Sequence, residues 1–130
     1  MSEEQYTIDH NEQFNYVILK RNNFASKEIF QSSTNKSIEL LKQHRSDKLI
    51  IDDTKVRFVT PENQEWILDH FSNTGYAQGL RFLAVVKPQS LIGEYTVNKI
   101  FEQAPIRTTT PIEVRFFSLM DEAEAWMREM

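Results

Sequence analysis

The chain has 130 residues, the usual size of one domain, and its 40% hydrophobic and 12% aromatic residues are enough to form a core. It has no cysteine, which excludes disulfides, thiolate metal sites and cysteine nucleophiles and favours a cytoplasmic location. The net charge of -4, with Lys and Arg scattered along the chain, argues against nucleic-acid binding. Because the sequence shows neither a signal peptide nor an apolar run of roughly 20 residues, we expect neither secretion nor a membrane span.

The first third of the sequence predicts a strand followed by a helix. Residues 1–13 are polar, and the alternation of Tyr6 and Ile8 is compatible with either a short edge strand or a frayed end. Residues 14–20 (FNYVILK) are aromatic and β-branched, which predicts a strand, and a polar turn at residues 21–24 is expected to follow it. Ser26 can begin a helix, whose inward stripe consists of Ile29, Phe30, Ser33, Ser37, Leu40 and Leu41. The serines in this stripe would let the helix lie close to a sheet.

The middle of the sequence predicts a central strand and a second helix. Residues 48–53 (KLIIDD) form a short apolar run that ends in acids, as in a strand buried on both faces. Residues 60–62 (TPE) supply an N-cap, a proline at the first helical position and an acid in the first turn. The inward stripe of this helix consists of Trp66, Ile67, His70 and Phe71. We expect Gly75 and Gly79 to end the helix or loosen its last turn.

The last third continues the same alternation. Residues 81–87 (RFLAVVK) and 112–117 (IEVRFF) predict two more strands, and residues 97–104 predict a helix between them. The final helix is expected to follow Ser118, and its inward stripe consists of Met120, Ala123, Trp126 and Met127. No linker or repeat divides the chain. The sequence therefore predicts a single α/β domain with a mostly parallel sheet of four to five strands covered by helices.

Several enzyme chemistries can be tested against the residues. The adjacent Asp52 and Asp53 would point to opposite faces of a strand, so they cannot flank one substrate atom. The simpler interpretation is that Asp53 ends the strand by hydrogen bonding the turn at Thr54 and Lys55. A phosphoacceptor receiver domain would need a further Asp at the end of the third long strand, which residues 80–88 lack.

The sequence also lacks the motifs that are typical of cofactor and metal sites. The sequence has three glycines, too dispersed for a phosphate-binding loop, and no serine in a nucleophile-elbow pattern. The histidines His10, His44 and His70 lack the local spacing of metal ligands. For His70 a hydrogen-bonded structural role is favoured over a catalytic one. We therefore expect no enzymatic activity, no metal and no cofactor.

From residue 14 to residue 130 the chain resembles the STAS domains, in particular the bacterial SpoIIAA-like group of anti-sigma-factor antagonists. The resemblance rests on the order of elements and on three segments, "IIDDTKVRFVTPENQEWI", "GLRFLAVVKP" and "DEAEAWM". It implies a SpoIIAA-like α/β domain with a non-enzymatic regulatory or protein-interaction role. Switching members of the group have an Asp-Ser-Ser/Thr-Gly tract at the start of the second helix, whereas this chain has Thr60-Pro61-Glu62-Asn63. The usual phosphoserine is thus missing, and Thr60 is the nearest hydroxyl, either as a helix cap or as a switch.

Two functions follow as hypotheses. The first is a cytoplasmic domain that binds a protein partner through the loop from Asp53 to Asn63, and its candidate residues are Asp53, Thr54, Thr60, Pro61, Glu62 and Asn63. The second is a small-molecule or lipid-binding domain, because SpoIIAA-like domains resemble CRAL-TRIO domains in topology. In that case Phe, Met and Trp side chains between the late helices and the sheet would form an apolar pocket.

Overall fold

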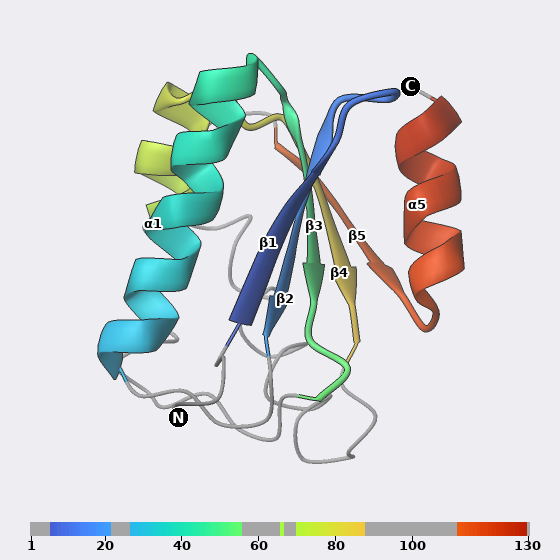
Figure 1. The fold of residues 1–130 in the computed structure, drawn as a ribbon, viewed down its shortest axis with the longest axis horizontal. Helices are drawn as coiled ribbons and strands as arrows, with labels where there is room; N and C mark the ends of the chain where they lie inside the picture. Colours follow the sequence, from blue (N-terminus) through green and yellow to red (C-terminus); the bar gives the residue numbers. More distant parts are fainter. Residues whose placement is uncertain (1–5, 22–26, 56–65, 67–69, 88–111, 130) are drawn as a thin grey trace.

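One five-stranded sheet forms the centre of the protein (Figure 1). The computed structural model describes residues 6–21, 27–55, 66, 70–87 and 112–129. The strands lie in the order of the chain and are β1 (Tyr6–Asn11), β2 (Tyr16–Arg21), β3 (Lys48–Asp52), β4 (Phe82–Val86) and β5 (Glu113–Phe117). β1 is antiparallel to β2, and the other three pairings are parallel. The predicted mostly parallel α/β sheet is confirmed.

Helices cover both faces of this sheet (Figure 1). α1 (Lys27–His44) and the π-helical segment η1 (Phe71–Gly75) lie on one face, and α5 (Met120–Glu129) lies on the other. None of the helices in the described ranges is long and apolar enough to cross a membrane. The helix predicted for residues 97–104 and the predicted start of the second helix at residues 60–62 lie outside the described residues.

The core has two parts because successive residues of a strand point to opposite faces. On the α1 face, buried residues of the three central strands pack against the helix, namely Val17, Leu19, Leu49, Ile51, Leu83 and Val85. On the α5 face, Ile50, Ala84 and Val86 pack against Ala123, Trp126 and Met127. The residues predicted to lie inward on the last helix are thus buried, except Met120, which is half-buried. β3 is covered on both faces, as its apolar run predicted.

Small hydroxyl side chains bring α1 close to the sheet. Ser33 and Ser37 are buried as predicted, and so is Thr34, which the prediction omitted. Each hydroxyl donates to a carbonyl one turn earlier in the helix, Ser33 and Thr34 to Phe30 at 2.9 and 3.0 Å and Ser37 to Thr34 at 2.7 Å. These bonds satisfy the hydroxyl hydrogens within the helix, and the hydroxyl of Thr34 also accepts a hydrogen bond from Arg21 of β2.

The amino-terminal segment forms a strand, β1, that pairs with β2 along its whole length. β2 begins later than predicted because the preceding residues belong to the hairpin turn, where Asn15 has a φ of 53°. The Asn15 side-chain amide donates to the carbonyl of His44, and the hydroxyl of Ser46 donates to the carbonyl of Asn15. The hairpin turn is therefore attached to the end of α1.

The helix before β4 ends at Gly79, and Gly75 does not interrupt it. Gly75 is the last residue of η1, and the helix continues to Ala77. Gly79 has a φ of 110°, a left-handed conformation that glycine adopts at low cost. The N–H of Leu80 donates to the carbonyl of Gly75, and the N–H of Gly79 donates to that of Tyr76. This is the bonding pattern of a Schellman helix end.

Candidate functional site

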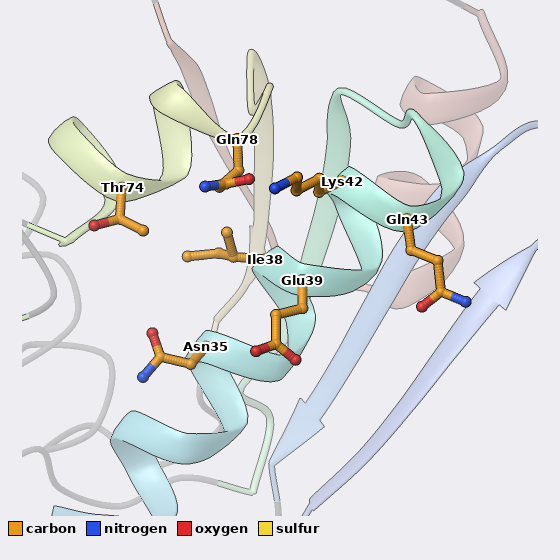
Figure 2. Close-up of a pocket in the computed structure, with 7 residues that line it drawn as sticks. All are labelled: Asn35, Ile38, Glu39, Lys42, Gln43, Thr74 and Gln78. Atoms are coloured by element: carbon orange, nitrogen blue, oxygen red, sulfur yellow. The ribbon is translucent and has the colours of Figure 1, made fainter.

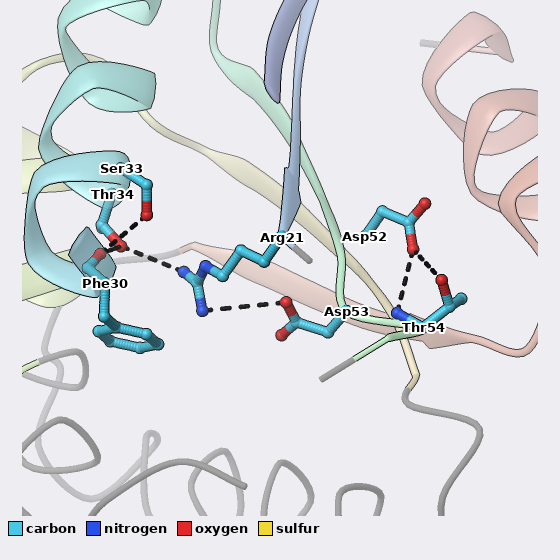
Figure 3. A network of polar contacts seen from close by, with 7 residues as sticks. All are labelled: Arg21, Phe30, Ser33, Thr34, Asp52, Asp53 and Thr54. Atoms are coloured by element: carbon cyan, nitrogen blue, oxygen red, sulfur yellow. Dashed lines mark hydrogen bonds and ion pairs between the residues drawn. The ribbon is translucent and has the colours of Figure 1, made fainter. Parts of the chain in front are cut away.

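The candidate site lies where β3 ends. Asp52 is the last residue of β3, and the N–H of Asp53 donates to the carbonyl of Val86 in β4 at 3.1 Å. Figure 3 shows the two carboxylates pointing in opposite directions, Asp52 toward Thr54 and Asp53 toward Arg21. The expectation that this pair cannot act on one substrate atom agrees with this geometry.

Asp52, rather than Asp53, forms the turn that ends the strand. Its Oδ1 accepts hydrogen bonds from the backbone N–H and the hydroxyl of Thr54, at 3.1 and 2.8 Å. The prediction that Asp53 makes these bonds was wrong. The reason is the alternation of side chains along the strand, which directs Asp53 to the α1 face and leaves Asp52 to close the turn.

Asp53 instead faces a buried arginine (Figure 3). Nη1 of Arg21 lies 3.9 Å from Oδ1 of Asp53, and the two side chains are only 3% and 7% exposed. Arg21 also donates from Nη2 to the hydroxyl of Thr34 at 3.1 Å, and its guanidinium carbon lies 4.1 Å from the ring centre of Phe30. Arg21, which was expected in a polar turn, is instead the last residue of β2.

This ion pair is incompletely satisfied. Nε of Arg21 and Oδ1 of Asp53 are buried and have no hydrogen-bond partner. Burial raises the pKa of the Asp53 carboxyl, an effect that Arg21 opposes and Asp52 reinforces. Burial also lowers the pKa of Arg21, which Asp53 in turn raises. Because desolvation of two charges offsets most of their attraction, such a pair contributes little net stability.

Aromatic contacts extend from the ion pair to the helix that follows the loop. The ring of Phe30 meets Trp66 edge to face with their centres 6.2 Å apart, and Trp66 stacks on His70 at 4.2 Å. Asp53 precedes residues 56–65, and Trp66 and His70 follow them. The contacts through Arg21 and Phe30 therefore connect the two ends of the candidate loop to β2 and α1.

The surroundings of His70 differ at one ring nitrogen from the hydrogen-bonded structural role that was predicted for it. Its Nε2 is buried without a hydrogen-bond partner, so the proposed hydrogen bond is absent at this atom. Burial lowers the pKa of the ring. A neutral imidazole stacked on Trp66 fits this environment, because a protonated ring would lose more hydration.

The six predicted site residues divide into two groups. Asp53 is buried and Thr54 is half-buried, so Asp53 does not lie on the surface. Thr60, Pro61, Glu62 and Asn63 lie outside the described residues. Arg21 and Phe30, which the sequence did not single out as site residues, extend the contacts of Asp53 toward α1.

A pocket of about 670 Å³ lies on another part of the surface, between α1 and the helix that contains η1 (Figure 2). The residues that line it are polar or charged apart from Ile38, but apolar atoms form the larger part of the lining surface; they are Asn35, Ile38, Glu39, Lys42, Gln43, Thr74 and Gln78. The ligand hypothesis expected a pocket elsewhere, between the late helices and the sheet. Of the side chains near α5, the rings of Phe82 and Phe117 contact Trp126 within the core.

The described residues also bear on metal binding. They contain no group of three or more His, Asp or Glu side chains that could hold a metal ion.

Comparisons with known proteins bear on the fold. Comparison with protein-family models found no match, and comparison with curated proteins found none either. Among solved structures, the chain is similar to an uncharacterised protein of the DUF3478 family from Shewanella loihica PV-4, described as having a SpoIIAA-like fold. The match covers 98% of both chains with a TM-score of 0.63 and 18% sequence identity. Together with the sheet order and the helices on both faces, this similarity identifies the fold of the chain as SpoIIAA-like.

Proposed function

We propose that the chain is a non-enzymatic, cytoplasmic regulatory domain that binds a protein partner through the loop from Asp53 to Asn63. The observation that supports this most is the Arg21–Asp53 pair, buried beside the loop at a distance of 3.9 Å. A pair of this kind adds little stability, so the fold gains little by keeping it unless it positions the loop. In sheets with parallel strands, binding surfaces commonly lie beyond the carboxyl ends of the strands.

The chemistry near the loop also favours binding over catalysis. Asp52 uses its carboxylate to close the turn at Thr54. Asp53 faces Arg21 and is buried, and His70 is stacked on Trp66. In the described part of the chain, these groups do not converge on a point where a substrate atom could lie, which a catalytic site requires.

In this proposal Thr60 is a helix cap and not a phosphoacceptor. The residues after Thr60 are Pro61 and Glu62, where switching members of the SpoIIAA-like group have a serine-rich tract. Proline at the first helical position and an acid in the first turn suit a helix start. Regulation would then depend on the partner and not on a phosphoserine.

Affinity capture from a lysate of the native host tests the proposal. The loop variant Glu62→Ala/Asn63→Ala should capture a specific partner about tenfold less than wild type, because central interface residues account for most binding energy. The matched control is Lys42→Ala/Gln43→Ala, which changes two exposed residues of α1 and should capture the partner as wild type does. No reproducible partner, or equal capture by the loop variant, would contradict the proposal.

A further inference from the structure

β1 is an edge strand with little protection against pairing. In the described ranges no strand pairs with its outer side, since β1 is first in the sheet order. It pairs with β2 through six consecutive residues without a bulge, contains no proline and has one carboxylate, Asp9. Proteins usually block such edges with charges, prolines or bulges. At the opposite edge, β5 exposes the ion pair of Arg115 and Glu113.

The side chains of β1 alternate between two environments. Tyr6 and Ile8 pack against the core on the α1 face, and the ring of His10 stacks on that of His44 with their centres 3.7 Å apart. By the same alternation Thr7 and Asp9 belong to the other face, and Asp9 is exposed. The contacts of β1 therefore fix which side chains lie on each face. Tyr6, Ile8 and His10 lie on the α1 face, and Thr7 and Asp9 lie on the other.

The side chains of two β1 strands, one from each copy of the chain, are complementary when the strands pair in one particular register. If two copies of β1 pair antiparallel about a two-fold axis at Ile8, Thr7 lies opposite Asp9 of the partner subunit, and Tyr6 lies opposite His10 of the partner subunit. The hydroxyl of Thr7 can then donate to the facing carboxylate. The His10 ring already stacks on His44, and its Nε2 is hydrogen bonded to Asn15 at 2.7 Å. With the axis at Asp9 instead, two carboxylates would face each other and repel.

We propose that two copies of the chain associate through their β1 strands in this Ile8-centred register and join their sheets. The interface is isologous, as most homodimer interfaces are. Pairing of two short strands buries less surface than the roughly 1,200 Å² of stable specific complexes, so the association is weak and concentration-dependent. The β5 edge of each sheet, and α5, take no part in this interface.

Sedimentation analysis of the wild-type chain over concentrations up to about 1 mM tests the association. Thr7→Asp places like charges opposite each other on both sides of the axis and should weaken the dimer roughly tenfold. The swapped variant Thr7→Asp/Asp9→Thr has the same residue types as wild type and restores the complementary pair, so its dimerisation should return to near the wild-type value. Thermal unfolding of all three proteins checks that each is folded.

Each remaining outcome overturns the proposal. A wild-type chain that stays monomeric throughout would exclude pairing through β1. A Thr7→Asp variant that dimerises as wild type, or a swapped variant as weak as Thr7→Asp, would exclude the Ile8-centred register.

Discussion

Replacement of Asp53 by leucine is expected to lower the free energy of unfolding by about 3 to 5 kcal/mol. The substitution leaves the guanidinium of Arg21 buried at 3% exposure without its counter-charge. Thr34 and Phe30 would remain in contact with Arg21, but neither neutralises it. Chemical denaturation of the variant and the wild type at neutral pH measures the loss, and a loss below about 1 kcal/mol would show that the pair is not buried as described.

The double variant Arg21→Met/Asp53→Leu is the matched control. Replacing both charges by apolar groups removes both desolvation costs, so its stability should lie within about 1 kcal/mol of wild type or above it. A double-mutant cycle that includes Arg21→Met then gives the coupling between the two residues. If the double variant were as unstable as Asp53→Leu alone, loss of packing and not of charge pairing would explain the effect.

The pH dependence of the single variant Arg21→Met gives an independent check on the cycle. Burial raises the pKa of Asp53, and Arg21 opposes this increase. Without Arg21, the folded-state pKa rises further above the unfolded value of about 3.9. A carboxyl with a raised pKa stabilises the fold below its unfolded pKa, and this contribution is lost as pH rises through the folded pKa. Relative to the double variant, Arg21→Met should therefore lose stability as the pH rises above the unfolded pKa of about 3.9, and a constant difference would contradict this interpretation.

Trp126→Ala is expected to cost about 3 to 5 kcal/mol of unfolding free energy, the usual range for a buried tryptophan. Trp126 is 8% exposed, and its ring meets Phe82 edge to face and Phe117 at centre distances of 6.1 and 5.8 Å. In the described part of the chain α5 is the helix that covers this face, so a cavity here weakens the attachment of the helix to the sheet.

Urea denaturation measures this loss, and Glu129→Ala provides a control on the same helix. Glu129 is exposed, so its replacement should change the stability by less than about 0.5 kcal/mol. If Trp126→Ala cost no more than this control, α5 would contribute little to the core.

The arrangement of the sheet could be predicted because several periodicities agree. The continuous apolar run of β3 indicated a strand buried on both faces, and both β3 and β4 are packed on both sides. The serines on the inward stripe of α1 were identified by helical spacing alone. These patterns depend on residues close together in sequence, which is why they could be recognised without the structure.

The support of the candidate loop could not be predicted in the same way. Arg21 was assigned to the polar turn after the strand, although it continues the inward alternation of Val17 and Leu19. Arginine is rarely buried, so composition alone did not favour this position. That alternation was the signal in the sequence that could have revealed it. The roles of Asp52 and Asp53 could not be distinguished, because both faces of β3 are covered and hydrophobicity does not indicate which side holds a partner charge.

The most direct test of the proposed function is isothermal titration calorimetry of the captured partner with the Arg21→Met/Asp53→Leu variant. This variant is expected to keep its fold while losing the buried pair beside the loop. If the pair positions the loop for binding, the dissociation constant should rise at least about tenfold relative to wild type. A dissociation constant equal to that of wild type, in a variant of unchanged stability, would contradict the account.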